Sequence, residues 1–250
     1  MTLTAQNLSM TFGGLVALDR VSLTVPDRRV IGLIGPNGAG KTTLFNCLTG
    51  LYAPTSGQVL LNGRPLAADP AEAARSGIAR TFQNIRLFTE MSALDNVLVG
   101  RHTRIRQGLL AALLHGPGFR RSEAEAVERA RAELTFVGLD PAGRIPARSL
   151  AYGDQRRLEI ARALASDPSV LMLDEPTAGM NATETAAIRE LILAIRERGT
   201  AVVVIEHDTK FIFSLCDHVH VLMRGQLLVD GPPEAVRADP RVIEAYLGAA

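Results

Sequence analysis

Some side-chain types are scarce in this 250-residue chain, which has no tryptophan, two cysteines and 4% aromatic residues. Cys47 and Cys216 form no C-x-x-C pair and no cluster with histidine, so they predict reduced thiols in a cytosolic protein and argue against zinc chemistry. No apolar run reaches the roughly 18 to 20 residues of a bilayer-spanning helix. Residues 1–10 hold no Lys or Arg and no apolar signal segment. We expect a cytoplasmic chain that does not itself cross a membrane.

The chain also has no large excess of positive or negative charge. The 27 basic and 26 acidic residues leave a formal net charge of +1, which argues against a protein that binds nucleic acid by covering its phosphates. Lysine is rare, because only Lys41 and Lys210 stand among 25 arginines. The 47% share of hydrophobic residues is typical of a globular chain. A single domain of this length buries about 70 to 75% of its unfolded surface without disulfides.

Two apolar patterns divide the sequence. Apolar residues alternate with polar ones, as in half-buried antiparallel strands, at residues 3–11, 20–25 and 58–62. Short, almost wholly apolar runs, as in parallel strands covered on both faces, occur at residues 30–34, 170–173 and 201–205. Helical patterns lie between these runs, at residues 41–51, 123–137, 155–165 and 184–197. The sequence therefore predicts an α/β fold with a mostly parallel sheet and a small N-terminal antiparallel β-subdomain.

The middle of the chain, from about residue 83 to 155, has no buried-strand pattern. Ser122 and Glu125 form an S-x-x-E capping box, which predicts the start of a helix that ends near Gly138. We expect one domain over residues 1–250, with an inserted helical subdomain at about 84–155 and a C-terminal helical tail at about 233–250.

Residues 101–121 carry five arginines and no acid around four leucines. The common origin of such a pattern is a solvated loop and an amphipathic helix packed on its own subdomain. The alternative is a surface that faces anionic lipid or a membrane partner.

A phosphate-binding motif follows the first buried run. It fits G-x-x-x-x-G-K-[ST] and stands between a strand and a helix, the context that confirms a P-loop; its residues are Gly35, Pro36, Asn37, Gly38, Ala39, Gly40, Lys41 and Thr42. Glycines let backbone N–H groups point at the α- and β-phosphates, and the helix N-terminus adds about half a positive charge. We expect Lys41 to reach the β- and γ-phosphates and the Thr42 hydroxyl to bind Mg²⁺.

Two adjacent carboxylates follow the buried run at residues 170–173. Asp174 is expected at the carboxyl end of that strand, where α/β sheets bind ligands, and there it can hold Mg²⁺ through water. Glu175 is placed to polarise a water for in-line attack on the γ-phosphate. A helix cap or a solvated turn would also place two acids here, but the P-loop favours ATP hydrolysis.

The order of these motifs resembles the ABC transporter ATPases over essentially the whole chain. The P-loop is followed by Gln83 in Thr-Phe-Gln-Asn, by Leu-Ala-Tyr-Gly-Asp-Gln at residues 150–155, by Asp174-Glu175 and by His207 in Ile-Glu-His-Asp. Narrower features resemble the ATP-binding subunit of branched-chain amino acid importers, among them Phe-Gly-Gly-Leu at residues 12–15 and Glu-Ala-Tyr-Leu-Gly at residues 244–248.

The resemblance implies a role for several further residues. Phe12 would stack on adenine, although its position alone would also fit a core aromatic. Gln83 would reach Mg²⁺ and the attacking water, Thr43 would join the phosphate site, and His207 would contact the γ-phosphate. Without the other motifs of the family, Gln83 would be interpreted as an ordinary loop residue and His207 as a cap at the end of a strand. Arg86, Leu87 and Phe88 lead into the inserted helical region, and we expect this stretch to form part of the groove for a permease helix.

The family sandwiches ATP between the P-loop of one chain and the signature segment of another. In this sequence the signature segment is Leu150, Ala151, Tyr152, Gly153, Asp154 and Gln155, whose N–H groups open a helix and form an anion site. Ala151 stands where Ser is usual in the general family, and Asn181, in the expected contact loop between the two chains, replaces Asp. The branched-chain subfamily resembles this sequence at both places.

Asp154 stands where the resemblance leads us to expect Gln. An acid at a helix N-terminus gains roughly 0.3 to 1 kcal/mol, whereas repulsion from a γ-phosphate about 8 Å away is roughly 2 kcal/mol at an effective dielectric near 20. Asp154→Gln should then tighten the ATP-bound dimer. Alternatively, Asp154 turns outward and only caps its helix.

The implied partners are a second ABC ATPase chain, identical or related, two transmembrane permease subunits and, indirectly, a periplasmic binding protein that delivers leucine, isoleucine or valine, with no nucleic acid. ATP and Mg²⁺ are the implied cofactors, and the implied location is the cytoplasmic face of the cell membrane. Two alternatives stay open: an importer ATPase for another solute such as urea or an amide, and a soluble ABC protein without a transport role.

Overall fold

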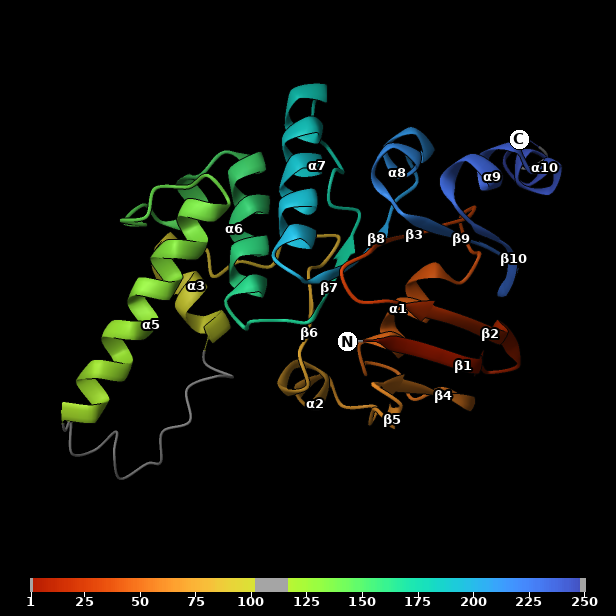
Figure 1. The fold of residues 1–250 in the computed structure, drawn as a ribbon, viewed down its shortest axis with the longest axis horizontal. Helices are drawn as coiled ribbons and strands as arrows, with labels where there is room; N and C mark the ends of the chain where they lie inside the picture. The colour runs from red at the N-terminus through yellow and green to blue at the C-terminus, as the bar shows by residue number, and fades with distance from the viewer. Residues whose placement is uncertain (1, 102–116, 248–250) are drawn as a thin grey trace. The chain divides into compact units, whose positions relative to one another are not determined.

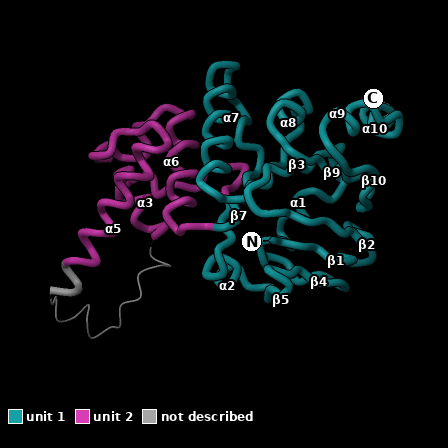
Figure 2. The backbone as a smooth tube through the Cα atoms, in the orientation of Figure 1, with its two compact units in different colours: residues 1–80, 169–250 teal, residues 81–168 magenta. Residues whose placement is uncertain are grey.

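A computed structural model describes residues 2–101 and 117–247 (Figure 1). The chain divides into two compact units, of which the first comprises Met1–Arg80 with Ser169–Ala250 and the second Thr81–Pro168 (Figure 2). The helical insertion expected at about residues 84–155 falls inside the second unit. The basic segment 101–121 lies outside the described residues for most of its length, so neither interpretation of it is tested.

An antiparallel sheet forms from the N-terminal part of the first unit. Its strands lie in the order β2-β1-β4-β5 and comprise β1 (Leu3–Phe12), β2 (Leu15–Val25), β4 (Ser56–Leu61) and β5 (Arg64–Pro65). The pairing of β1 with β2 shifts register between Ala5 and Leu8. A bulge of this kind inserts one extra residue, which explains why Leu3, Ala5 and Leu8 are all buried despite their uneven spacing.

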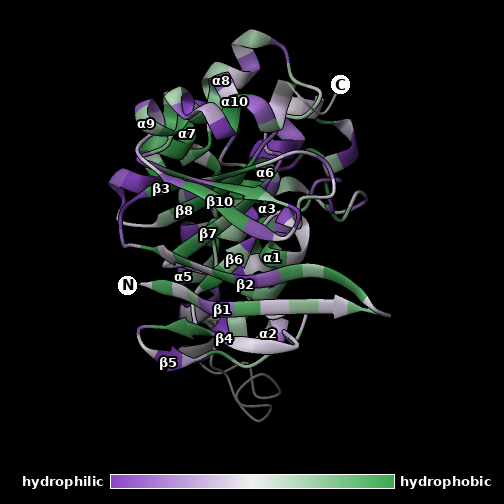
Figure 3. Cartoon of the chain, turned by 90° about the vertical axis from the view of Figure 1, so that its right-hand side faces the viewer, coloured by the Kyte–Doolittle hydropathy of each residue, from purple (hydrophilic) through white to green (hydrophobic). Residues whose placement is uncertain are grey.

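The second sheet of this unit is mostly parallel. Its order is β10-β9-β3-β8-β7-β6, with β6 (Ile78–Arg80), β7 (Val170–Asp174), β8 (Ala201–Ile205), β3 (Val30–Ile34), β9 (His218–Met223) and β10 (Gln226–Gly231). Only β10 runs antiparallel, to β9. Every residue of β3, β7 and β8 is buried, and these strands appear green in Figure 3. The predicted α/β fold class is confirmed.

The helices of the first unit lie between or after its strands in chain order. They are α1 (Lys41–Leu48), α2 (Pro70–Arg75), α7 (Ala182–Glu197), α8 (Thr209–Leu215), α9 (Pro233–Ala238) and α10 (Pro240–Leu247). Helix α7 begins with a reciprocal capping box, in which the Asn181 side chain accepts from Glu184 N and the Glu184 side chain accepts from Asn181 N. Among the residues that the structure describes, no helix combines the length and apolarity needed to cross a bilayer.

The second unit is helical. It contains α3 (Ala93–Arg101), α5 (Pro117–Phe136), the short 3₁₀ helix η2 (Ala147–Ser149) and α6 (Tyr152–Leu164). The predicted capping box at Ser122 is wrong, because α5 begins at Pro117 and Ser122 lies inside the helix. A proline at the first helical position is already set for helical φ. Glu125 pairs instead with Arg121, one turn earlier. The predicted end near Gly138 is confirmed, since Gly138 has φ 79° just beyond Phe136.

Candidate nucleotide site

The loop between β3 and α1 has a shape that only glycine permits at two positions. Gly35 and Gly40 have φ of 152° and 99°, values that side chains disfavour. A Cβ on Gly35 would stand 2.2 Å from the Leu222 carbonyl oxygen, and one on Gly40 would stand 2.6 Å from the Ala17 carbonyl oxygen. Gly40 also caps α1 without a side-chain hydrogen bond. The first turn of α1 therefore presents backbone N–H groups that no capping side chain occupies.

Lys41 begins α1 and folds back over this loop. Its Nζ donates to the carbonyl oxygens of Gly35, at 2.7 Å, and Pro36, at 3.1 Å. Burial lowers the pKa of Lys41, and the charges of Glu175 and Asp174 oppose that shift. The ammonium group therefore lies within electrostatic reach of both Asp174, the predicted Mg²⁺ ligand, and Glu175, the predicted catalytic carboxylate.

Asp174 ends β7 in a buried position, and an arginine side chain lies beside its carboxylate. Nη2 of Arg80, on the adjacent strand β6, lies 3.7 Å from Oδ2 of Asp174. The Arg80 guanidinium also donates to Asn46 Oδ1 at 2.9 Å and covers the Phe45 ring, with its carbon 5.2 Å from the ring centroid. Sequence reasoning missed Arg80. It links the acidic strand end to the helix that carries Lys41.

Glu175 continues directly from β7 in an unusual backbone conformation. Its φ is 46°, in the left-handed region that a residue with a side chain adopts only when its surroundings enforce it. Its N–H donates to the Ile205 carbonyl oxygen at 2.9 Å, so the neighbouring strand β8 fixes this turn. Nδ1 of the exposed His207 lies 3.9 Å from Oε1 of Glu175. The structure thus brings together these two residues, which are 32 positions apart in the sequence.

Glu206 is a buried acid beside this pair that sequence reasoning left without a role. One of its oxygens, Oε1, accepts from the Thr177 backbone N–H at 3.0 Å and from the Thr177 hydroxyl at 2.6 Å. The other, Oε2, accepts from the His207 N–H at 3.3 Å. Glu206 therefore ties the turn after Glu175 to the segment that carries His207. Its position between a buried strand and His207 was the available signal.

Phe12 ends β1 with its side chain 42% exposed, which excludes the alternative of a core aromatic. The ring meets Tyr52 edge to face, with centroids 5.6 Å apart and planes at 74°. An exposed aromatic of this kind offers a face for stacking on a planar base. Tyr52, which supports the ring, was not predicted.

The donor set of the first unit fits a magnesium nucleotide. An exposed Thr42 hydroxyl and the Asp174 carboxylate are the hard oxygen ligands that Mg²⁺ prefers. Lys41 and the N-terminus of α1 supply the positive charge and the N–H groups that phosphates require. These residues therefore fit both Mg²⁺ and the phosphates of a nucleotide.

Gln83 belongs to the second unit, where a buried ion pair holds its backbone. The fully buried Arg156 donates to the carbonyl oxygens of Phe82 at 2.7 Å and Gln83 at 2.9 Å. Glu159 Oε2 pairs with Arg156 at 2.8 Å, and its other oxygen accepts from Phe82 N at 3.4 Å. The Gln83 side chain is left exposed. Neither Arg156 nor Glu159 was predicted.

The signature segment opens α6, also in the second unit. The helix begins at Tyr152, three residues before the predicted start, and Ala151 caps it without a side-chain hydrogen bond. Gln155 folds back, with Nε2 donating to the Leu150 carbonyl oxygen at 2.9 Å. Gly153 and Asp154 lie in the first turn. An anion approaching this helix end would meet N–H groups that no side chain of the cap occupies.

Known proteins share this architecture and sequence. The sequence profile of the family described as "ABC transporter" matches residues 18–178, and that of the "Branched-chain amino acid ATP-binding cassette transporter" matches residues 226–250. The chain is 48% identical to the high-affinity branched-chain amino acid transport ATP-binding protein LivG of Salmonella typhimurium, covering 99% of this chain and 98% of that protein. It is 49% identical, at the same coverage, to BraF of Pseudomonas aeruginosa, which carries the same description.

Solved structures agree with these sequence matches. The ADP conformation of an ATP-binding cassette of an ABC transporter has a TM-score of 0.86 and 33% identity, and the match covers 99% of both chains. A bacterial ABC transporter cassette solved as a dimer has a TM-score of 0.76 and 25% identity, and the match covers 92% of this chain and 98% of that one.

Proposed function

The chain belongs to the ABC transporter family of ATP-binding proteins, and from this premise we propose that it hydrolyses ATP to drive an importer of branched-chain amino acids. The observation that carries the solute class is the 48 to 49% identity, along almost the whole length, to LivG and BraF. The P-loop geometry supports the ATPase part independently of those names.

The residues of the first unit divide the work at the nucleotide. Lys41 and the first turn of α1 bind the β- and γ-phosphates, and Phe12 stacks on the base. Within this unit the residues that would hold Mg²⁺ are Thr42 and Asp174, and the ion would neutralise phosphate charge. Glu175 accepts a proton from the attacking water. His207, held by the Glu206 contact to its backbone, orients the γ-phosphate.

Hydrolysis on this proposal needs a second ATPase chain. The uncapped N-terminus of α6 suits the γ-phosphate of a nucleotide held by the partner's P-loop. The dimeric cassette structure among the relatives supports such an assembly. Asn181 would lie at the contact between the chains, where the observed capping box fixes its side chain.

The membrane-facing part of the proposal rests on the relatives' description as transport ATP-binding proteins. Two permease subunits receive the mechanical change, a periplasmic binding protein delivers the solute, and the ATPase works at the cytoplasmic face of the membrane. An importer for another solute such as urea or an amide would differ in its partners, because none of the residues proposed for the nucleotide site would contact the solute.

Reconstitution in vesicles tests both levels of the proposal. The chain is combined with the permease and binding proteins encoded beside its gene, and ATP hydrolysis is measured with leucine, isoleucine, valine, urea and acetamide. We expect stimulation by the three amino acids. Stimulation only by urea or the amide would overturn the solute class and keep the ATPase assignment. Hydrolysis that survives Lys41→Ala at the wild-type rate would overturn the nucleotide site itself.

A further inference from the structure

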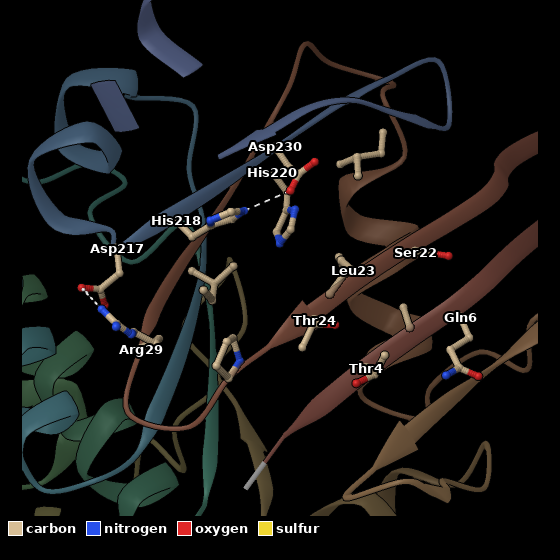
Figure 4. A pocket seen from close by; sticks show the side chains of 14 residues that line it. Thr4, Gln6, Ser22, Leu23, Thr24, Arg29, Asp217, His218, His220 and Asp230 are labelled. Atoms are coloured by element: carbon tan, nitrogen blue, oxygen red, sulfur yellow. Dashed lines mark hydrogen bonds and ion pairs between the residues drawn. The ribbon is translucent and has the colours of Figure 1, made fainter. Parts of the chain in front are cut away.

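A cavity of about 690 Å³ lies in the first unit, between the β1–β2 strands and the β9–β10 strands (Figure 4). One wall carries polar side chains of the antiparallel sheet, including Thr4, Ser22 and Thr24, and the opposite wall carries His218, His220 and Asp230. The register pairs His218 with Ile31, upstream of the P-loop on β3. None of these residues takes part in the proposed nucleotide chemistry.

The three side chains of the second wall are brought together by strand geometry. His218 and His220 are two residues apart on β9, so they project from the same face of the strand. Asp230 on β10 stands directly opposite His220 in the antiparallel register. Nε2 of His218 lies 3.1 Å from Oδ2 of Asp230, and the two imidazole centroids are 5.0 Å apart. One ligand atom from each residue lies within 4.8 Å of the other two.

His220 is the buried member of these three residues. Its side chain is 4% exposed, and neither Nδ1 nor Nε2 has a hydrogen-bond partner among the described residues. Buried polar atoms of this kind are rare in native proteins, and each requires an explanation. The Thr24 backbone lies near the His220 ring, but not in hydrogen-bonding geometry. A neutral imidazole has one ring nitrogen with a free lone pair, which can bind a metal ion.

We propose that His218, His220 and Asp230 form a site for a divalent transition-metal ion, with Zn²⁺ as the ion that fits best. Imidazole nitrogens with one carboxylate are ligands that Zn²⁺ accepts, at about 2.0 to 2.2 Å. Two donors on one tetrahedral ion then stand roughly 3.3 to 3.6 Å apart. The 3.1 Å between His218 and Asp230 is close to this spacing. Zn²⁺ would replace the hydrogen bond between His218 and Asp230, and rotation of these two side chains would bring both donors toward the buried His220.

The absence of cysteine clusters does not bear on this site, because all three ligands are nitrogen or oxygen. The expectation against zinc chemistry was based on the lack of a C-x-x-C pair and of a cluster of cysteine with histidine. The other acid of the cavity is committed elsewhere: Asp217 accepts from Val30 N at 2.8 Å and pairs with Arg29 and Arg196. The proposed ion would cross-link β9 to the edge strand β10, and its remaining coordination position would face the cavity.

Calorimetric titration of the full-length, tag-free chain with Zn²⁺ tests the proposal. Nucleotide is left out because its phosphates chelate zinc, and excess Mg²⁺ occupies sites made only of oxygen. We expect one Zn²⁺ to bind per chain and to raise the Tm, and EDTA should reverse that increase. With Co²⁺ in place of Zn²⁺, we expect the visible d–d absorption of a low-symmetry site. His218→Gln, Asp230→Asn and His220→Leu should each weaken Zn²⁺ binding by at least about tenfold, since even groups that only hydrogen-bond to a metal ligand contribute roughly 10- to 100-fold.

Matched controls separate this site from other histidines. His207→Gln removes the imidazole of the nucleotide site, and the pair His102→Gln with His115→Gln removes the two remaining ones; Zn²⁺ affinity should stay at the wild-type value in both. Because His218 and Asp230 are not buried, their variants keep the test valid even if His220→Leu fails to fold. No Zn²⁺ binding by the wild type, wild-type affinity in His218→Gln and Asp230→Asn, or loss of binding in His207→Gln would each overturn the site.

Discussion

Asp154 and Arg157 pair across one turn of α6, with Oδ1 of Asp154 3.3 Å from Nη1 of Arg157. The cation offsets part of the charge that Asp154 would bring to a neighbouring phosphate. Both side chains are partly exposed, so the pair itself contributes little to stability. In the proposed dimer, its importance would lie in the net charge that the start of α6 presents to a partner's nucleotide.

This pair gives opposite predictions for two variants. Asp154→Gln should tighten the ATP-bound dimer, by less than the roughly 2 kcal/mol of an unpaired charge, whereas Arg157→Gln should weaken it. Sedimentation of the two variants with ATP, each in a Glu175→Gln background, measures both affinities, and the differences should shrink at high salt. Equal dimer affinity in wild type, Asp154→Gln and Arg157→Gln would show that Asp154 only caps its helix.

Glu175→Gln should abolish most hydrolysis and keep nucleotide binding. The amide preserves the shape of the side chain but cannot accept a proton from water. A general base contributes typically 10²- to 10⁴-fold, so kcat should fall by at least about 100-fold while the Kd for ATP changes little. Glu190→Gln, an exposed acid on α7, is the matched control. Wild-type turnover in Glu175→Gln would assign the proton to another group.

The buried pair in the second unit predicts a large stability difference. Arg156→Met removes the cation 2.8 Å from the buried Glu159 and leaves Arg162 at 4.0 Å, so the loss should approach the roughly 3 to 5 kcal/mol of a broken buried pair. Adding Glu159→Leu should recover part of this, although the Phe82 and Arg86 N–H groups then lose an acceptor. Urea unfolding measures both. Arg131→Met breaks the exposed pair with Glu128 and should cost less than about 1 kcal/mol. A double variant no more stable than the single one would contradict this account.

Phe88 should matter for transport more than for folding. Its side chain is 49% exposed, although its N–H is fixed by Asn96 Oδ1 at 2.9 Å. Because surface substitutions usually change stability by no more than about 0.5 kcal/mol, Phe88→Glu should keep the Tm and ATP binding of the isolated chain. Leucine uptake by reconstituted vesicles should fall. Ile145→Glu, another exposed apolar position of the second unit, is the control; parallel loss of Tm and uptake in Phe88→Glu would indicate a folding defect.

Both cysteines should resist thiol reagents in the native chain. Burial raises the pKa of Cys47 to about 11 and that of Cys216 further. At pH 8 about one Cys47 in a thousand is then a thiolate, the reactive form. Ellman's reagent should therefore react slowly until urea exposes two thiols per chain, and in a Cys216→Ser variant the native rate should rise about tenfold from pH 8 to 9. A thiol that reacts at once at pH 8 would contradict the buried positions.

The parts of the fold that the sequence predicted depend on contiguous residues. β3, β7 and β8 are buried on both faces, so their apolar runs identify them, and the P-loop motif lies within eight successive positions. Strand β9 was missed because His218 and His220 interrupt its apolar residues. These histidines line the cavity between β1–β2 and β9–β10, which local sequence cannot indicate. The start of α5 was misplaced because the S-x-x-E pattern also occurs within helices.

Four of the five unpredicted site residues share one property. Arg80, Arg156, Glu159 and Glu206 are charged residues held by tertiary contacts, whereas charge in a sequence usually indicates an exposed position. Each is stabilised by backbone groups or by an opposite charge from a distant segment. Only the three-dimensional structure supplies those partners.

Because the backbone at Glu175 is left-handed, selection for stability and selection for activity favour different residues at this position. Such a conformation costs roughly 1 to 2 kcal/mol for a residue with a Cβ, and glycine avoids that cost. Glu175→Gly should therefore raise resistance to unfolding while it removes the carboxylate. A directed-evolution screen that rewards only thermal tolerance would drift toward an inactive chain at this position. The strain at Glu175 is thus maintained only as long as turnover itself is selected.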